Sequence, residues 1–550
     1  MASVVKGYDG TAKMHWRTHS RPALAVDRQI AYNGGMKRTA LLPLFVAIAA
    51  VGSSRGAEPS LRSVEGQIQK AIDAATQSVV SVVVSHLKYP IEGLGKVKPG
   101  LLGAYDPSTD PDLIGQDVRP RWGPMRDFKL PNKKDLSVAE NISDHTFGSG
   151  VVLDAEKQLI LVPYHLIEGA TKIYLRSSTV GGTYANIHAA DAKCDLAVLK
   201  TIRKIDGLAA TTIGDVRTTP SDGSKPTVRR GTMVLALGHG TASSVADGVS
   251  SSSWGIVSGV RQRSASTALS SLAIMNEKPL HSQGGLIQTD ARIALGTSGA
   301  GLFNMDGELI GLGSSVAAVT GSEANGGYAV PLDRAYRRMI DVLKSGGEIE
   351  YGFLGIGPDD HPDGVAITLV SPGGPAMAAG LRVGDVITSV DGVKLKQKDD
   401  MLLTVAAALA GTEVKVEFKR SGTLQSADVV LAKNVNPMAS IASVPAPTPF
   451  GLRCDYTSIK FAGVQFGPAR NQNPPPAGVL IRDVEPDSPA DKVLKQLEAP
   501  RGGAWVITAV DSTAVTLPAD VYRLTKNKAK ATFTIVDAEG ANPKQTITLP

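Results

Sequence analysis

Short apolar runs separated by glycine-containing turns fill the chain between residues 147 and 332. Each run is only a few residues long, which fits a strand and is too short for a stable helix. Many short strands at this spacing predict a barrel or a sandwich, so the fold class is expected to be mainly β. The candidate strands are Val151–Leu153, Leu159–Val162, Lys172–Arg176, Leu196–Lys200, Met233–Leu237, Gly255–Val260, Leu286–Thr289, Gly301–Asn304 and Leu309–Gly313.

The rest of the chain predicts further domains, because 550 residues exceed what one hydrophobic core supports. A smaller mixed unit follows at 351–433. Residues 451–550 repeat its pattern less clearly, with Val506–Asp511 matching Val386–Asp391. Prolines in residues 434–450 between the two units predict a stiff linker.

The first large domain is expected at 58–345 and contains a long insertion. Residues 91–143 are rich in proline, glycine and charge without a clear period, which predicts a surface loop. A helix over Asp333–Leu343 is expected to close the domain.

The beginning of the chain has the form of an export signal. Residues 36–57 are expected to be a signal peptide, because Met36 and two basic residues precede the apolar run Leu41–Val51. This run is too short to span a bilayer comfortably. Because such a peptide starts at an initiator, we expect 1–35 to be a non-native extension. The alternative is an uncleaved membrane anchor. N-terminal sequencing of the mature protein distinguishes the two.

Charge and cysteine content narrow the class of protein. The net charge of +6 comes from 1–35 and 36–57, which carry +3 each, so no nucleic-acid-binding surface is expected in the body. Cys194 and Cys454 lie in different predicted domains, which argues against a disulfide framework. Export with so few cysteines favours the periplasm, the cell envelope or the extracellular space. No later apolar run is long enough for a stable membrane span.

Three residue types at strand ends carry candidate chemistry. His165 follows the run Leu159–Val162, and a histidine there can act as general base. Asp195 directly precedes another apolar run, and its carboxylate can orient an imidazole. Ser298 stands in Gly296-Thr297-Ser298-Gly299, where glycines let backbone N–H groups converge on one point. Each alone also fits a structural histidine, a turn aspartate or a simple glycine-rich turn. The order His, Asp, Ser is that of chymotrypsin.

The smaller unit has a second set of motifs. Tyr351-Gly352-Phe353-Leu354-Gly355-Ile356 precedes Ser371-Pro372-Gly373-Gly374-Pro375-Ala376 and Gly380-Leu381-Arg382-Val383-Gly384-Asp385. This combination resembles a PDZ domain, in which a peptide adds to a sheet edge and its carboxylate meets backbone N–H groups. The resemblance makes Gly352, Phe353, Leu354 and Gly355 the carboxylate loop. A scaffold with a closed groove is the alternative. For the second unit, the alternative to peptide binding is a purely architectural or subunit-contact role.

The whole pattern resembles the HtrA/Deg family of trypsin-like serine endopeptidases with C-terminal PDZ domains. The matching stretches are Gly148–Asp154, the His165 turn, Asp195–Leu199 and Gln288–Gly311. The resemblance implies a chymotrypsin/trypsin-like double β-barrel followed by two PDZ-like α+β modules, without cofactor or metal.

The resemblance also implies residue roles. His165 would be the base, Asp195 its orienting carboxylate and Ser298 the nucleophile. The N–H groups of Gly296 and Ser298 would form the oxyanion hole. A specificity pocket would involve Leu312, Gly313 and Ser314.

The expected function is hydrolysis of peptide bonds in unfolded or damaged exported proteins, with chain ends captured by the first PDZ module. By resemblance, the chain would assemble as a homotrimer or a multiple of trimers. The alternative is a proteolytically inactive chaperone or peptide-binding scaffold. A metalloprotease is disfavoured because the sequence has no His-Glu-x-x-His motif.

Overall fold

The computed structural model describes residues 61–86, 145–177, 181–218, 224–239, 249–262, 279–283, 285–293, 296–314, 326–459, 476–497, 500, 503–538 and 543–550. The predicted extension 1–35, signal peptide 36–57 and insertion 91–143 lie outside these described residues. Within them, no helix combines the length and apolar character needed to cross a membrane.

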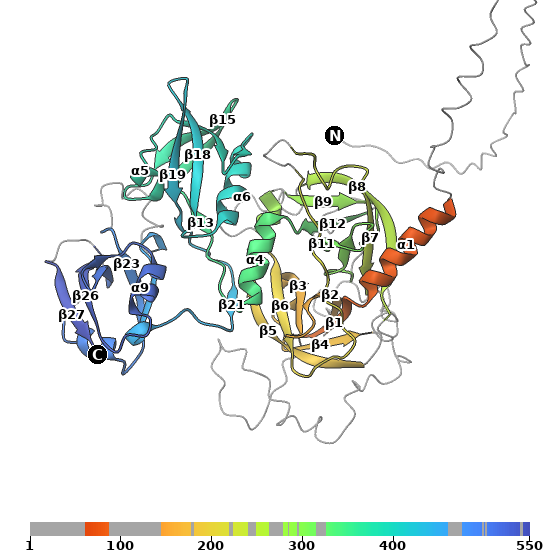
Figure 1. The fold of residues 1–550 in the computed structure, drawn as a ribbon, viewed down its shortest axis with the longest axis horizontal. Helices are drawn as coiled ribbons and strands as arrows, with labels where there is room; N and C mark the ends of the chain where they lie inside the picture. The colour runs from red at the N-terminus through yellow and green to blue at the C-terminus, as the bar shows by residue number, and fades with distance from the viewer. Residues whose placement is uncertain are drawn as a thin grey trace, which may run out of the picture. The chain divides into compact units, whose positions relative to one another are not determined.

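The first six strands form a barrel in the order β5-β4-β1-β2-β3-β6, closed because β5 pairs with both β4 and β6 (Figure 1). Valine, leucine and isoleucine dominate β1 and β3, and every residue of these two strands is buried. The strands are β1 (Val79–Ser85), β2 (His145–Asp154), β3 (Leu159–Pro163), β4 (Lys172–Ser177), β5 (Gly181–Asp191) and β6 (Leu196–Thr201).

The next six strands form a second closed barrel in the order β10-β11-β12-β9-β8-β7. One cluster of buried apolar side chains includes Leu161 of the first barrel and Leu237 and Leu312 of the second, so the barrels share a core. The predicted mainly-β double-barrel fold is confirmed. These strands are β7 (Met233–Gly238), β8 (Ser251–Gln262), β9 (Leu286–Thr289), β10 (Gly301–Phe303), β11 (Leu309–Gly313) and β12 (Gly327–Pro331).

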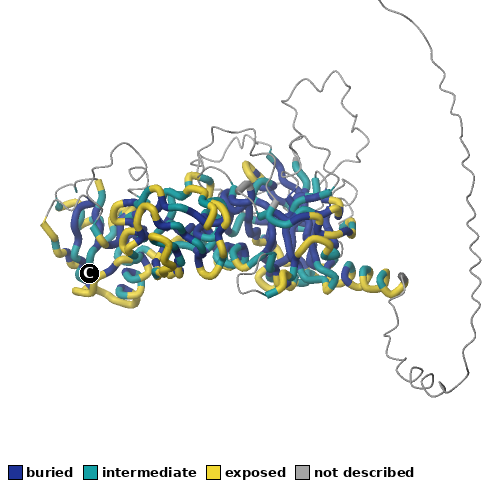
Figure 2. The backbone as a smooth tube through the Cα atoms, turned by 90° about the horizontal axis from the view of Figure 1, so that it is seen from above, coloured by how far each residue is buried: buried dark blue, intermediate teal, exposed yellow. Residues whose placement is uncertain are grey.

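In the described part of the chain, three α-helices accompany the barrels: α1 (Leu61–Thr76), the single turn α2 (Tyr164–Ile167) and α4 (Arg334–Lys344). Helix α4 begins after Asp333, whose carboxylate accepts the N–H groups of the first helical turn. Its buried residues recur at helical spacing and face β5 and β6. Helix α1 is mostly exposed, whereas the barrel strands are largely buried (Figure 2).

The two C-terminal modules have the same strand order. The first has a sheet β14-β15-β16-β18-β19 with β17 beside β16, and the second has β22-β23-β24-β26-β27 with β25 beside β24. Each module has one helix after its second sheet strand and one before its fourth. The two predicted α+β modules are therefore present, and their shared topology accounts for the similar sequence patterns.

The elements of the first module are β13 (Gly352–Phe353), β14 (Ile356–His361), β15 (Gly364–Val370), α5 (Pro375–Ala378), β16 (Val386–Val390), β17 (Val393–Lys394), α6 (Lys398–Ala408), β18 (Glu413–Arg420), β19 (Thr423–Val430) and β20 (Ala432–Lys433). Those of the second module are β22 (Leu452–Tyr456), β23 (Val479–Val484), α8 (Pro489–Leu494), β24 (Trp505–Val510), β25 (Thr513–Ala514), α9 (Pro518–Thr525), β26 (Ala531–Asp537) and β27 (Gln545–Leu549).

The segment between the modules is more than a spacer. Residues 434–450 contain the short strand β21 (Ser440–Ala442), which pairs antiparallel with the end of β5. Ile441 packs against the core of the first barrel. A strand that follows the first C-terminal module in sequence is thus part of the sheet of the first barrel.

Candidate active site

His165 follows the end of β3, and contacts of its backbone fix its position. Pro163 ends the strand, and the single turn α2 follows with Leu166 and Ile167 buried beneath it. The backbone N–H of His165 donates to Oδ1 of Asp195 at 2.9 Å. The imidazole keeps 20% of its surface exposed, so the ring is anchored at its base and reachable from solvent.

Asp195 lies in the turn between β5 and β6, at a positive φ of 56°. Its carboxylate is 5% exposed and lies 2.8 and 3.0 Å from Nδ1 of His165. Burial raises the pKa of Asp195, but the His165 ring beside it and the hydrogen bonds from His165 outweigh burial and leave the pKa lowered. The carboxylate is therefore ionised at neutral pH. It requires a proton on Nδ1, which leaves Nε2 of the neutral ring as an acceptor.

Ser298 lies in a tight turn just before β10, and its Oγ is 2.8 Å from Nε2 of His165. Gly296 and Gly299 on either side have positive φ values of 87° and 86°. The turn is fixed by bonds from Gly299 N–H to the Gly313 carbonyl at 2.8 Å and from Ala300 N–H to the Thr297 carbonyl at 2.9 Å. The structure thus brings His165, Asp195 and Ser298 into one continuous hydrogen-bonded chain.

A glycine on each side, Gly148 of β2 and Gly299 of the nucleophile turn, allows this close approach between the barrels. A Cβ atom at Gly148 would lie 2.7 Å from the carbonyl oxygen of Ser298, and one at Gly299 would lie 1.9 Å from that of Ser149. Ser149 N–H donates to the Ser298 carbonyl at 2.8 Å, and Ser149 Oγ accepts from the N–H of His239. The sequence marks Gly148 and Ser149 as part of a family pattern, but only the structure gives them this supporting position.

The other residues predicted for the site lie around the same turn. Gly296 and Ser298, the predicted oxyanion donors, are two positions apart within it. Gly313 at the end of β11 is bonded to this turn: its carbonyl accepts the N–H of Gly299, and its N–H donates to the carbonyl of Ala300. The side chain of Leu312 packs in the shared core, so only the backbone of Leu312 is left to line a specificity pocket. Ser314 Oγ is buried, with no hydrogen-bond partner among the described residues.

His281 is a neighbour of the site that sequence reasoning missed. It is 7% exposed and lies in the short 3-10 helix Leu280–Gln283, which is tied to the Asp195 turn by a bond from Leu280 N–H to the Lys193 carbonyl at 2.6 Å. Burial lowers its pKa, whereas the charge of Asp195 opposes the fall. The ring is therefore neutral at pH 7. No motif around His281 signals this position.

The predicted carboxylate loop of the first C-terminal module has a defined orientation. The carbonyls of Leu354 and Gly355 accept from the N–H groups of Ala376 and Ser371, each at 2.9 Å. In a trans peptide the following N–H points the opposite way, so the N–H groups of Gly355 and Ile356 point away from these partners. Strand β14, which starts at Ile356, is the terminal strand of its sheet. The loop therefore presents donors beside a strand edge.

The remaining predicted loop residues are more enclosed. Gly352 and Phe353 form β13, which pairs with β20, and Leu354 is buried in the core of the module. By strand order, the equivalent of Gly355 in the second module is Gly451, which precedes β22 and whose carbonyl accepts the N–H of Glu485 at 2.9 Å. The sequence pattern points instead to Phe461–Val464, which follows β22 and lies outside the described residues.

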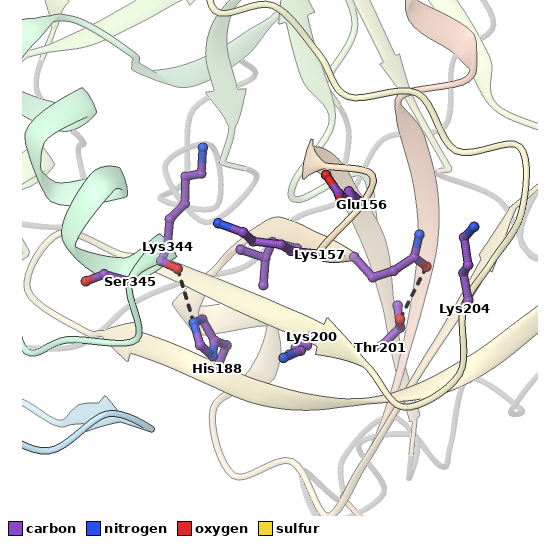
Figure 3. Close-up of a pocket in the computed structure, with 10 residues that line it drawn as sticks. Glu156, Lys157, His188, Lys200, Thr201, Lys204, Lys344 and Ser345 are labelled. Atoms are coloured by element: carbon purple, nitrogen blue, oxygen red, sulfur yellow. Dashed lines mark hydrogen bonds between the residues drawn. The ribbon is translucent and has the colours of Figure 1, made fainter.

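A basic cavity of about 530 Å³ lies on the first barrel and contains none of the predicted site residues (Figure 3). Lys157, Lys200, Lys204 and Lys344 contribute to its lining, together with His188. His188 Nε2 lies 3.2 Å from the carbonyl oxygen of Lys344 at the end of α4. Its Nδ1 lies 2.9 Å from Ser443 Oγ, just beyond β21. His188 therefore connects β5 of the barrel to the end of α4 and to the residue that follows β21.

Comparisons with protein families agree with this arrangement. Residues 148–312 match the model of a trypsin-like peptidase domain, and residues 352–431 match that of a PDZ domain. Among solved structures, the HtrA-type protease AlgW with a tripeptide shares 21% identity over 67% of this chain and 98% of its own, with a TM-score of 0.43. A serine endoprotease from Yersinia pestis shares 22% identity over 67% and 98%, with a TM-score of 0.39.

Curated relatives are more informative about the family. The "Periplasmic pH-dependent serine endoprotease DegQ" of Escherichia coli is 30% identical over 66% of this chain and 74% of its own length. The "Probable periplasmic serine endoprotease DegP-like" of Halomonas elongata is 28% identical over 52% of this chain. The match spans only 56% of the Halomonas protein. With a trypsin-like peptidase domain followed by a PDZ domain and 30% identity to a relative of which it covers 74%, this chain belongs to the HtrA/Deg family of trypsin-like serine endopeptidases with C-terminal PDZ domains.

Proposed function

We propose that the protein is a serine endopeptidase whose nucleophile is Ser298. The observation that carries the proposal is the hydrogen-bonded chain from Asp195 through His165 to Ser298. His165 Nε2 takes the hydroxyl proton as Ser298 Oγ attacks the scissile carbonyl, and ionised Asp195 stabilises the imidazolium that forms. The protonated ring then protonates the leaving amine, which leaves an acyl-enzyme. Water, deprotonated by His165, releases the acid and regenerates the serine.

The charge that develops on the attacked oxygen needs donors. The N–H groups of Gly296 and Ser298 fill this role in the proposal, because the positive φ values of the flanking glycines suit a backbone that turns successive N–H groups to one side. Such donors typically contribute about 3–4 kcal/mol of transition-state stabilisation each. The pocket for the side chain before the scissile bond would lie beside Gly313 and Ser314.

Substrate capture is assigned to the first C-terminal module. A peptide can add to the free edge of β14, with its terminal carboxylate near the N–H groups of Gly355 and Ile356. The proposed substrates are unfolded or damaged exported proteins, since extended chains offer both cleavable bonds and free ends. The relatives described as periplasmic support a periplasmic location. We propose no peptide-binding role for the second C-terminal module.

Assembly as a homotrimer or a multiple of trimers is part of the proposal. Trp254 and Ile256 project from the same face of β8 and are 61% and 38% exposed, and Val249 just before the strand is 58% exposed. A cluster of large apolar side chains on a barrel exterior fits a contact with a second copy of the chain.

Degradation of casein tests the proposal. Wild type is expected to cleave it without ATP or added metal, and Ser298→Ala is expected to be inactive while retaining its fold by circular dichroism. Failure of folded wild type to cleave casein or a short peptide, combined with suppression of aggregation of an unfolded protein, contradicts the proposal and favours a chaperone.

A further inference from the structure

A second aspartate is buried four positions before Asp195. Asp191 is fully buried, and Oδ1 of its carboxylate accepts the N–H groups of Lys193 at 2.9 Å and Cys194 at 3.0 Å. These bonds close the turn that connects β5 to β6, and Asp195 is the last residue of that turn. Asp191 therefore organises the backbone that carries the orienting carboxylate.

Two further donors to the Asp191 carboxylate come from outside the barrels. The hydroxyl of Tyr351 donates to Oδ1, and Asn436 Nδ2 donates to Oδ2 at 3.2 Å. Tyr351 directly precedes the carboxylate loop of the PDZ domain, and Asn436 follows the last strand of that domain. Each of the two segments that flank the PDZ domain thus donates a hydrogen bond to the same carboxylate of the protease domain.

Further contacts fasten the same turn to these segments. Ala192 N–H donates to the carbonyl of Ala439 at 2.9 Å, and Ser440 of β21 pairs with Asp191. The ammonium group of Lys193, which is 3% exposed, lies 4.8 Å from the centre of the Tyr351 ring. Tyr351 is itself fully buried. The turn is thus packed against the flanking segments as well as bonded to them.

The turn needs such support because of the backbone of Asp195. A non-glycine residue at a φ of 56° is disfavoured by about 1–2 kcal/mol, so surrounding contacts must hold it. The Asp195 carbonyl accepts from Tyr164 N–H at 3.1 Å, which ties its conformation to the position of His165. A small rotation of the turn would therefore lengthen the bonds between Asp195 and Nδ1 of His165.

We infer that Asp191 is a positioning residue for Asp195, held in place by Tyr351 and Asn436 on either side of the PDZ domain. The inference rests on the proposed peptidase function and adds that the catalytic geometry is completed by residues outside the double barrel. Burial raises the pKa of Asp191, while the Tyr351 hydroxyl and the backbone N–H groups favour its charged form. Removal of these donors leaves a buried carboxylate short of partners.

The test uses the full-length variants Tyr351→Phe and Asn436→Ala. Two variants serve as controls. Tyr522→Phe removes a hydroxyl that donates to the Cys454 carbonyl at 3.2 Å in the second module. Ser443→Ala removes a bond from the β21 region to His188, away from Asp191. Displacement of a catalytic group by a fraction of an ångström to 1 Å lowers turnover by about ten- to hundredfold.

On a short fluorogenic peptide, we expect Tyr351→Phe and Asn436→Ala to lower kcat about tenfold or more with KM changed less than about twofold. Both controls are expected to keep wild-type kcat. In an Asp195→Asn background, Tyr351→Phe is expected to cause little further loss, because a residue that acts through Asp195 has nothing left to position. Wild-type kcat in both test variants, or an equal loss in the Asp195→Asn background, overturns the inference.

An activity-independent measurement separates this inference from the proposed function. Hydrogen–deuterium exchange of peptides covering residues 191–199 is expected to accelerate in Tyr351→Phe and Asn436→Ala and to stay unchanged in Tyr522→Phe. This result supports the positioning role even if wild type hydrolyses nothing, which would defeat only the peptidase proposal. Unchanged exchange in both test variants contradicts the inference whatever the activity.

Discussion

The backbone N–H of Ser149 donates a hydrogen bond of 2.8 Å to the carbonyl oxygen of Ser298 and so joins a strand of the first barrel to the nucleophile turn of the second. No side chain separates the two backbones, because Gly148 and Gly299 leave no room for one. This contact holds the turn in the position where the Oγ of Ser298 lies 2.8 Å from Nε2 of His165.

A first prediction concerns Gly299. Gly299→Ala is expected to lower kcat/KM at least about a hundredfold, because its Cβ would lie 1.9 Å from the Ser149 carbonyl oxygen and displace the turn. Gly231→Ala is the matched control, since Gly231 has a similar φ of 84° with no atom near the added Cβ. It should cost about 1–2 kcal/mol of stability and keep its activity. Equal peptide hydrolysis by the two variants contradicts this explanation.

A second prediction concerns pH and Asp385 of the PDZ domain. Both carboxylate oxygens accept from Arg420, at 2.8 and 2.7 Å, and Oδ2 also accepts Arg382 N–H at 2.8 Å. Burial raises the pKa of Asp385, but these bonds and the arginine charges leave it below the ordinary value of 3.8. A pKa that folding lowers gives stability that is present above pH 3.8 and lost as pH falls through the lower folded value.

Hydrogen exchange of β16 and β18 in the full chain measures this effect. We expect wild type to lose protection as pH falls below about 4. Asp385→Asn is expected to lose about 1–3 kcal/mol already at pH 7 and to show a flatter acid response. Asp428→Asn, at an exposed position on β19, is the control and should behave as wild type. An Asp385→Asn profile that overlays wild type would refute the assigned role.

A third prediction addresses assembly through β8. Trp254→Thr is expected to convert a homotrimer into monomers at micromolar concentration, because it removes the largest exposed apolar side chain of the cluster with Ile256. Leu424→Thr removes an equally exposed apolar residue, 64% accessible on β19, and should leave the trimer intact. Light scattering after size exclusion gives the mass. A trimer that persists in Trp254→Thr places the contact elsewhere.

Sequence patterns predicted the elements that carry strong apolar runs. The predicted helix over Asp333–Leu343 lies within one residue of α4 at each end. The run Val151–Leu153 marked only part of β2, which extends back to His145, because glycine and polar residues fill its first half. That half is held by pairing with β1, a contact that local sequence does not encode.

Long-range pairing also explains what the sequence did not reveal. Strand β5 has no apolar run and is stabilised by β4 and β6 on its two sides. Strand β21 has only three residues and lies in a proline-rich segment. Asn436, just before it, is 245 positions from Asp191, to which it donates a hydrogen bond. No local period signals such a contact. The three residues at the centre of the site could be named in advance because each stands beside a predictable strand, whereas Asp191 and Tyr351 could not be assigned supporting roles.

Covalent labelling by a fluorophosphonate tests the central claim most directly, because the reaction needs the nucleophile, the base and the oxyanion donors together. We expect one adduct, located on Ser298 by peptide mass spectrometry. It should be absent in Ser298→Ala, and its formation should be strongly slowed in His165→Ala. Folded wild-type protein that stays unlabelled, or that reacts equally fast without the imidazole of His165, would contradict it.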